Sequence, residues 1–269
     1  MATVTAARRG KVAVITLDRP ARHNAMNAEM WAALDAALDV IEADLPRALV
    51  VTGAGEKAFC AGFDVRPDNP MVADLLTSVQ TGEEGPVAAL LHRIRGTVDR
   101  LAALPVPVIA ALGGLTYGGG AELACRCDLR VADPAVEIRF SEVRLGLMPD
   151  WGGGPALARL LGPSRAADLI LTARRVHAEE ALSLGLVNRV SAPGAALEEA
   201  VALGEQIAAN GPRAVRAALT VLRQSPDLPM ADALALELRV ATMLIAGGEC
   251  MHGISAFMAR AEPEFPDIG

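Results

Sequence analysis

Two glycine-containing loops and three acidic residues have the types and spacing needed for acid–base chemistry beside a polarised carbonyl. The first loop spans residues 57–64 and reads KAFCAGFD; the second spans residues 118–122 and reads GGGAE. Each loop follows an apolar run typical of a buried strand, at residues 48–52 and 106–112. Backbone N–H groups at the start of a helix or turn have no intrahelical partner, so two of them directed at one point can stabilise an oxyanion.

Three carboxylates lie in or after the second loop: Glu122, Glu142 and Asp150. Glu122 comes three residues after Gly119, which places it on the first turn of the helix that this loop is expected to open. Two carboxylates in one cleft shift each other's pKa, so that one can act as acid and the other as base. Taken alone, a glutamate at a helix start is more often a favourable N-terminal charge, and an aspartate before glycines often caps a loop.

The elements that must position these loops follow from apolar periodicity. Asn27 is expected to cap a helix over residues 28–43, with apolar residues at helical spacing. Residues 63–85 have no clean period, which favours a mobile loop with a short helix. Strands are expected at residues 11–17, 47–52, 108–112, 129–132 and 136–140, and helices at residues 87–104, 120–127 and almost throughout after 155. Strand–helix repetition followed by helices predicts a layered α/β core with a helical appendage.

Composition excludes several classes of protein. The chain has 269 residues, of which 52% are hydrophobic, a net charge of −7 and 3% aromatics. A nucleic-acid-binding protein would need a basic face, so no nucleic acid is expected as a partner. No membrane association is expected either, because the uncharged stretch 101–121 is interrupted by prolines and glycines. No signal peptide is evident and the four cysteines show no paired framework, so we expect a cytoplasmic protein. The Cys125–Cys127 spacing is one residue short of usual ligand spacing, so no metal is expected.

The motifs together resemble the enoyl-CoA hydratase/isomerase (crotonase) superfamily. Besides the two loops, the resemblance rests on ITLDRP (15–20), NAM (24–26), FSE (140–142), GLMPDWGG (146–153), AEEALSLGLV (178–187) and ISAFM (254–258). One such motif is a weak signal, whereas their occurrence in the family's order from about residue 10 to 265 is a specific one. The resemblance implies an α/β fold built as a spiral of ββα turns, with a C-terminal helical region that mediates oligomerisation.

The same resemblance implies a division of the chain and an assembly. We expect residues 1–194 to form the spiral core with the acyl-CoA and catalytic site, and residues 195–269 to form a helical trimerisation region. The region from residue 195 to 261 carries more apolar positions than a solvated appendage needs. The expected assembly is a homotrimer or a homohexamer made of two trimers.

Catalytic roles carry over from the family by position. The backbone N–H groups of Phe63 and Gly119 are implied to form the oxyanion hole. Glu122 and Glu142 match the glutamates with which the hydratases hold a water, one assisting its attack at C3 and the other giving a proton to C2. Hydratases commonly have glycine at the position of Asp150, whereas members that move double bonds place an aspartate there, and dienoyl-CoA isomerases have acids at all three positions.

The resemblance also implies an acyl-CoA thioester as substrate, with coenzyme A entering only as part of it, so no separate cofactor is expected. Arg22 is the first candidate for the nucleotide phosphates and Lys57 the second. Arg260 lies in a segment that in relatives reaches a neighbouring subunit's nucleotide, although relatives often have a denser basic cluster there. The complete set expected to bind substrate is Arg22, Lys57, Ala58, Ala61, Gly62, Asp64, Gly118, Pro149, Trp151, Phe257 and Arg260.

Three functions are compatible with these residues. The first is an enoyl-CoA hydratase, which adds water reversibly and syn across a trans-2-enoyl thioester. The second is an enoyl-CoA or dienoyl-CoA isomerase in which Glu142 or Asp150 carries the proton. The third is a non-catalytic acyl-CoA-binding protein with the same fold, which the presence of both glutamates disfavours.

Overall fold

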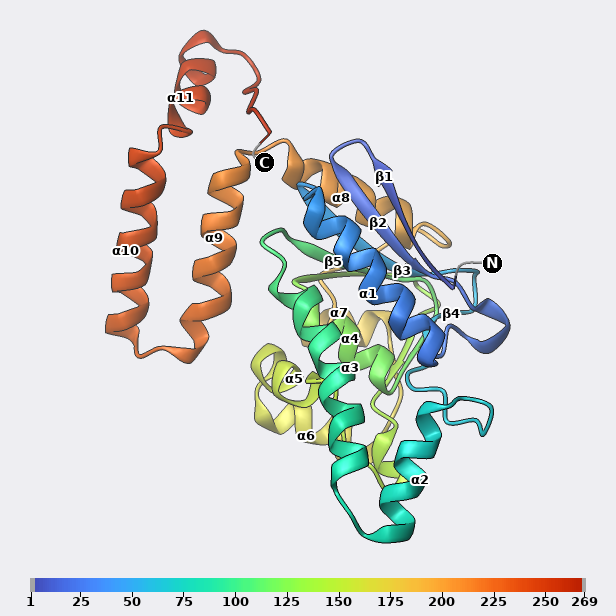
Figure 1. The fold of residues 1–269 in the computed structure, drawn as a ribbon. Helices are drawn as coiled ribbons and strands as arrows, with labels where there is room; N and C mark the ends of the chain where they lie inside the picture. Colours follow the sequence, from blue (N-terminus) through green and yellow to red (C-terminus); the bar gives the residue numbers. More distant parts are fainter. Residues whose placement is uncertain (1–2, 268–269) are drawn as a thin grey trace.

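Two small sheets lie side by side in the computed structural model, which describes residues 3–267 (Figure 1). The six-stranded sheet has the order β1 (Val4–Arg9), β2 (Val12–Leu17), β3 (Ala48–Gly53), β5 (Val108–Leu112), β7 (Leu129–Ala132) and β10 (Arg189–Val190). The four-stranded sheet has the order β4 (Ala58–Cys60), β6 (Leu115–Tyr117), β8 (Glu137–Arg139) and β9 (Val176–His177). Among residues 3–267, the pairs β1–β2 and β8–β9 are antiparallel, and all the other strand pairs are parallel.

The chain alternates between the two sheets. β3 is followed by β4, β5 by β6 and β7 by β8, with one strand of each pair in each sheet, and helices follow these pairs. Helices α2 (Met71–Thr81) and α3 (Gly85–Ala103) follow the first pair, α4 (Gly119–Arg126) the second, and α5 (Gly153–Leu161) and α6 (Pro163–Thr172) come after the third. This repetition is the spiral of ββα turns that the family resemblance implies, and it places both glycine-containing loops at the ends of neighbouring strands β4 and β6.

Local sequence accounts for most of these elements. Helix α1 (Ala28–Ala43) begins where expected, because the Asn27 side chain accepts a hydrogen bond of 3.0 Å from the Met30 N–H. Strand β1 was not expected from the sequence. It is an edge strand in which only Val4 is buried, so it lacks the apolar alternation that identifies a half-buried strand.

Helix α8 (Ala196–Ala208) covers one face of the six-stranded sheet. It packs on apolar residues of β2, β3, β5 and β7, and Gly204 allows close approach to Val12. The division expected at residue 194 therefore falls before a helix that belongs to the packed core. Short helix α7 (Ala178–Leu184) lies between β9 and β10.

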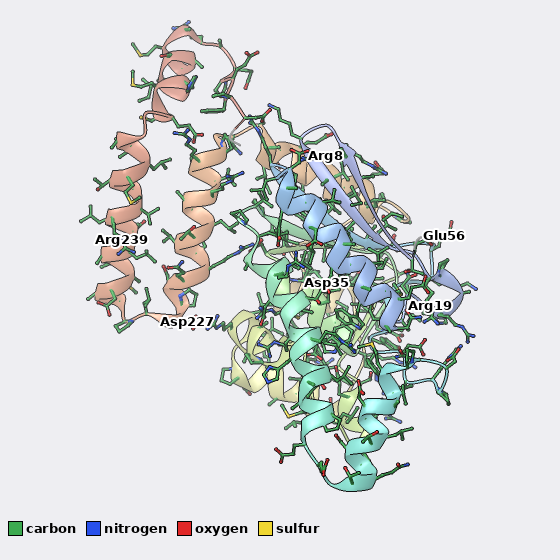
Figure 2. All side chains as sticks on the ribbon, viewed as in Figure 1. Arg8, Arg19, Asp35, Glu56, Asp227 and Arg239 are labelled. Atoms are coloured by element: carbon green, nitrogen blue, oxygen red, sulfur yellow. The ribbon has the colours of Figure 1, made fainter. Side chains whose placement is uncertain are left out.

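The remaining helices, α9 (Pro212–Gln224), α10 (Met230–Ala246) and α11 (Cys250–Ala259), form an arm that projects from the core (Figure 1). Within this chain α10 buries only Leu236 and α11 buries no residue. Side chains of the arm extend into open space, among them Arg239 (Figure 2). No helix among residues 3–267 is both long enough and apolar enough to span a membrane.

Candidate active site

The two glycine-containing loops meet and present two backbone N–H groups. Met26 pairs with the first loop through hydrogen bonds to the Gly62 carbonyl and from the Asp64 N–H, which leaves the Phe63 N–H pointing the other way. A Cβ atom on Gly62 would lie 2.8 Å from the Gly119 nitrogen, so the two loops are in direct contact. In the described chain neither the Phe63 nor the Gly119 N–H has a hydrogen-bond partner. Both residues line one cavity, as an oxyanion hole requires.

Close packing explains the glycines. Gly62 has φ 86° and Gly118 has φ 52°, backbone conformations that favour glycine. A Cβ on Gly119 would lie 2.5 Å from the Trp151 ring, and one on Gly120 would overlap the Cys60 carbonyl. The Trp151 ring is itself fixed by an edge contact with Trp31, with ring centroids 4.8 Å apart. The start of α4 is thus held against rigid neighbours.

Glu122 is held in place by backbone donors from a distant loop. Its side chain is on the first turn of α4 and the residue is 1% exposed. One carboxylate oxygen accepts hydrogen bonds of 2.8 Å from the N–H groups of Trp151 and Gly153, and the other accepts one of 3.1 Å from Asp150. Gly153 must be glycine here, because a Cβ would overlap the Glu122 side chain. The start of helix α5 therefore fixes the orientation of this carboxylate.

Glu142 lies at the start of the 3-10 helix η2 (Glu142–Leu145) and has a different environment. The residue is 9% exposed, and both carboxylate oxygens are buried without a hydrogen-bond partner among residues 3–267. A Cβ on Gly118 would lie 3.6 Å from one of these oxygens, so the carboxyl group is beside the start of α4. Because a buried carboxylate needs partners, Glu142 is poised to hydrogen-bond a molecule in the cavity.

Electrostatics favour one shared proton on the two glutamates. Burial raises the pKa of Glu122 to about 8, against the backbone hydrogen bonds that lower it, and the charges of Glu142 and Asp150 add to the increase. Burial also raises the pKa of Glu142. Three backbone N–H groups stabilise negative charge on Glu122, and a hydrogen bond with Glu122 opposes the increase in the pKa of Glu142, so the two carboxyl groups share one proton as a coupled pair.

Asp150 lines the same cavity as the two glutamates. Burial raises its pKa as well, while the positive charge of Arg95 opposes the increase. Arg95 lies over the same loop: a Cβ on Gly152 would be 3.3 Å from its guanidinium carbon. The structure thus brings all three predicted acids to one site.

The cavity itself has a volume of about 600 Å³ and two unlike walls. Ala61, Phe63, Gly118, Gly119 and the three acids form its polar side together with Ser141. The apolar wall comes from the loop after β4, from α2 and α3, and from η2 and the segment that follows it; it contains Val65, Leu75, Val87, Leu90, Leu91, Ile94, Leu145, Leu147, Met148 and Trp151. This pairing of acids with an apolar wall suits a substrate that has a polar reacting end and an aliphatic body.

Other residues expected at the substrate site take different places. Arg22 and Lys57 are exposed on adjacent loops, since the Asn24 amide donates to the carbonyls of Ala54 and Ala58. Ala58 and Pro149 are buried and, like Gly62, do not line the cavity. The Asp64 side chain is 4% exposed and forms an ion pair of 2.5 Å with Arg19, so it contributes to the shape of the loop.

Phe257 and Arg260 do not reach the cavity of their own chain. Phe257 is 81% exposed on α11, and Arg260 ends that helix with φ 54°. Neither lines the cavity, and α11 projects on the arm away from it (Figure 1).

Sequence reasoning missed the backbone donors that hold Glu122. The only local sign is the run Gly152–Gly154 before an apolar helix, which is typical of a helix start with close contacts. No cluster of three or more His, Cys, Asp or Glu that could hold a metal ion occurs in residues 3–267. The buried thiols of Cys60, Cys125 and Cys127 have pKa values raised to about 12 by burial, so they are not nucleophiles.

Comparison with known proteins identifies the class that this spiral and its two-loop site define. The family profile described as enoyl-CoA hydratase/isomerase matches residues 7–268. A Bacillus subtilis protein named for the same family is 38% identical over 96% of this chain and 95% of its own, and the short-chain-enoyl-CoA hydratase of Clostridium acetobutylicum is 36% identical over 90% and 86%. The crystal structure of an enoyl-CoA hydratase from Bacillus anthracis superposes with a TM-score of 0.87 at 32% identity, covering 98% of each chain. The chain belongs to the enoyl-CoA hydratase/isomerase family of the crotonase superfamily.

Proposed function

We propose that this protein is an enoyl-CoA hydratase that adds water to a trans-2-enoyl-CoA thioester. The observation that carries the proposal is the placement of two buried glutamates in one cavity beside two unpartnered backbone N–H groups. The thioester carbonyl accepts hydrogen bonds from the N–H groups of Phe63 and Gly119. Negative charge that develops on this oxygen during attack at C3 is stabilised by these two donors.

The unequal environments of the glutamates assign them different roles. Glu122, whose charge is stabilised by backbone donors, accepts a proton from the water that attacks C3. Glu142, whose carboxyl oxygens have no backbone donor, delivers the proton shared by the pair to C2. Both carboxyl groups line the same cavity, so in this proposal they act on one face of the double bond, and the net result is syn addition of one water.

Asp150 supports a second candidate, double-bond isomerisation. It lines the cavity with a pKa raised by burial, so it could also carry a proton along an acyl chain. In that case the proton would be taken from C2 and returned to C4 with no water added. Hydration is favoured because Glu122 is fixed by three backbone donors, an arrangement that isomerisation by Asp150 would not need.

We further propose that the nucleotide of the substrate binds near Arg22 and Lys57, and that the arm assembles the protein into a trimer or a dimer of trimers. The arm exposes Leu238 (70%), Met243 (69%) and Phe257 (81%), which would be costly to leave in water. Light scattering is expected to give three or six times 27.9 kDa. A clean monomer would contradict the assembly while leaving the proposed reaction intact.

Incubation with purified 2-enoyl-, 3-enoyl- and dienoyl-CoA thioesters, followed by mass analysis, tests the reaction. Hydration adds the mass of one water to the 2-enoyl substrate, whereas isomerisation leaves mass unchanged and converts the 3-enoyl substrate to the 2-enoyl product. A gain of water is the expected result. Isomerisation without hydration would replace the first candidate by the second, and no reaction with any of the three would contradict both.

A further inference from the structure

A buried acid directly follows one of the two oxyanion donors. Asp64 is the next residue after Phe63 along the chain, and its side chain is 4% exposed. Among residues 3–267, Asp64 and its ion-pair partner Arg19 are absent from the lining of the catalytic cavity. An oxyanion hole stabilises negative charge that develops on the thioester oxygen, whereas a fixed negative charge close by opposes it. The Asp64 carboxylate, left unneutralised, would therefore work against the donor that precedes it.

Arg19 holds this carboxylate from a neighbouring segment of the chain. Its Nη1 atom lies 2.5 Å from one Asp64 carboxylate oxygen, and the Arg19 side chain is 19% exposed. The same nitrogen donates a hydrogen bond of 3.1 Å to the Ala25 carbonyl, beside Met26, which pairs with the first glycine-containing loop. The Arg19 backbone N–H donates to the side chain of buried Asn24 at 2.9 Å. Both the backbone and the side chain of Arg19 are thus fixed against this loop.

A second cation near Asp64 is less able to neutralise it. The Arg66 Nε atom lies 4.0 Å from the other carboxylate oxygen, and the Arg66 side chain is 44% exposed. Water and salt screen an exposed charge at this distance, so its effect on Asp64 is small. The backbone N–H of Arg66 donates to the same oxygen at 3.2 Å, which orients the carboxylate without supplying a full charge. Neutralisation of Asp64 therefore depends mainly on Arg19.

We propose that Arg19 is a positioning residue for the reaction and acts through Asp64, whose charge it neutralises behind the Phe63 oxyanion donor. The inference rests on the proposed function only in requiring a thioester carbonyl in the oxyanion hole. Without Arg19, the negative charge of Asp64 would oppose the charge that develops on the thioester oxygen. At an effective dielectric constant of about 20, one such charge several ångströms away changes a rate on the order of tenfold.

A pair of variants separates this charge effect from simple loss of an ion pair. Arg19→Gln should lower kcat for a 2-enoyl thioester on the order of tenfold, with nearly unchanged binding of a saturated acyl-CoA, because the opposing charge acts mainly on the transition state. Arg19→Gln combined with Asp64→Asn leaves no charge to oppose the oxyanion, so this double variant should recover most of the lost kcat. A double variant as impaired as Arg19→Gln, or more so, would show that the pair only maintains the fold and would overturn the proposal.

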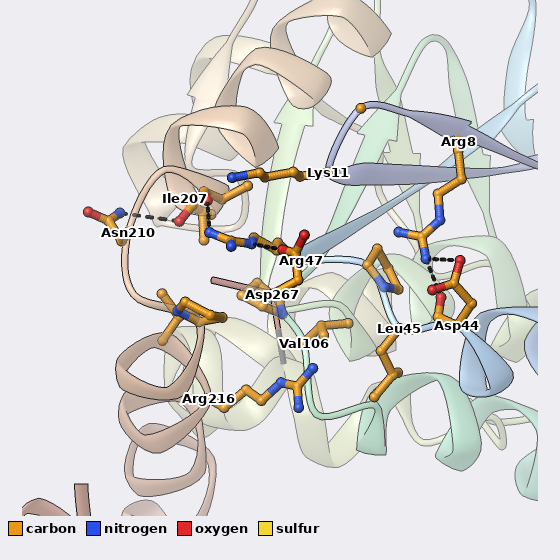
Figure 3. Close-up of a pocket in the computed structure, with 16 residues that line it drawn as sticks. Arg8, Lys11, Asp44, Leu45, Arg47, Val106, Ile207, Asn210, Arg216 and Asp267 are labelled. Carbon is orange, nitrogen blue, oxygen red and sulfur yellow. Dashed lines mark hydrogen bonds and ion pairs between the residues drawn. The ribbon is translucent and has the colours of Figure 1, made fainter. Parts of the chain in front are cut away.

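Two other arginines provide matched controls. Arg47 forms an ion pair of 2.7 Å with Asp267 and donates to two backbone carbonyls (Figure 3). It lines a cavity that, in the described part of the chain, shares no lining residue with the catalytic one. Arg47→Gln should therefore lower the free energy of unfolding and leave kcat unchanged. Arg66→Gln removes the exposed cation beside Asp64 and should change kcat little. A loss of kcat in Arg66→Gln equal to that in Arg19→Gln would contradict the role assigned to the buried cation.

The carbonyl stretching frequency of bound butanoyl-CoA measures the same effect without turnover. Hydrogen bonds from the oxyanion hole should lower this frequency in the wild type. The decrease should be smaller in Arg19→Gln and similar to wild type in the double variant and in Asp64→Asn. Asp64→Asn also tests the proposal if Arg19→Gln does not fold, since loss of the decrease there would implicate geometry instead of charge and overturn it. An undiminished decrease in Arg19→Gln would overturn this inference alone, whereas no decrease in the wild type would contradict the oxyanion hole itself.

Discussion

The polar wall of the catalytic cavity is made of buried turns, whereas the apolar wall is made largely of half-buried and exposed side chains. On the polar side, glycines at 119, 120 and 153 have no room for a Cβ, and Glu122 is 1% exposed. On the apolar side, Val65 is 59% exposed, Met148 is 70% exposed, and α2 buries only Met71. The polar wall can therefore hold reacting groups in one geometry, and the apolar wall can adapt to the acyl chain. Changes on the first wall should lower kcat, and changes on the second should alter KM and chain preference.

The largest effect is expected from Glu142→Gln. The substitution keeps the shape but removes the proton donor, so kcat should fall on the order of 10²–10⁴-fold. Acyl-CoA binding, measured by an isotherm, should be nearly intact. Glu179→Gln makes the same charge change at an exposed position on α7 and serves as the control. A near-wild-type kcat for Glu142→Gln would exclude Glu142 from acid–base chemistry.

Gly119→Ala should come next. Its Cβ would meet the Trp151 ring at 2.5 Å, so the start of α4 must shift and carry the oxyanion donor with it. Loss of one such donor typically lowers kcat by about 10²–10³-fold. Gly113→Ala is the matched control, because a Cβ there meets no atom within 4 Å. Equal activities for the two variants would argue against an oxyanion hole at Gly119.

The pH dependence of the rate reports the shared proton. Because burial raises the pKa of Glu122 to about 8, the singly protonated pair should persist through neutral pH. Above about pH 8 the loss of this proton should lower kcat/KM roughly tenfold per pH unit.

The free energy of unfolding should also decrease as the pH rises. The folded pair holds a proton that the unfolded chain loses above the ordinary glutamate pKa of 4.5, so the protein should become less stable between pH 4.5 and about 8. Denaturant unfolding at both pH values checks this, and a rise in stability with pH would contradict the shared proton.

Leu75→Ala and Leu76→Ala separate the apolar wall from the rest of α2. Leu75 lines the cavity and Leu76 does not. Truncation of Leu75 should lower kcat/KM for a long-chain thioester on the order of tenfold or less, with little change for a four-carbon one. Leu76→Ala should leave both unchanged. The same loss on both substrates would show that α2 affects catalysis and not chain binding.

The two walls also differ in how far the sequence predicts them. Helix α1, strands β2 and β5 and the start of α4 follow from capping and periodicity, and the family motifs lead to the spiral. The backbone donors to Glu122 could not be predicted from the sequence. Asp150, Trp151 and Gly153 are about 30 residues away from Glu122 along the chain and contact it only through tertiary packing. Residues 63–85, which contribute Val65 and Leu75 to the apolar wall, were expected to be a mobile loop with a short helix because they give no clean period. Its cavity-facing side chains are defined only by the packing of α2 on α3.

Placement of the substrate-binding residues was the least predictable from sequence. Arg22 and Lys57 are on adjacent loops because Asn24 reaches Ala54 and Ala58, a contact with no local signature. Phe257 and Arg260 belong to an arm whose own chain offers them no substrate contact, so a role for them needs a neighbouring subunit. That role stays a prediction that depends on the proposed assembly.

The most direct test of the account compares the hydration rates of Glu122→Gln and Asp150→Asn on one 2-enoyl thioester and repeats both on a 3-enoyl thioester. The account predicts a loss on the order of 10²–10⁴-fold for Glu122→Gln, and hydration within about tenfold of wild type, or roughly 1.4 kcal/mol in the barrier, for Asp150→Asn. Unfolding curves for both variants ensure that lost backbone hydrogen bonds at residue 122 are not mistaken for lost catalysis. Collapse of Asp150→Asn on the 3-enoyl substrate, with little wild-type hydration of the 2-enoyl one, would contradict it and identify an isomerase.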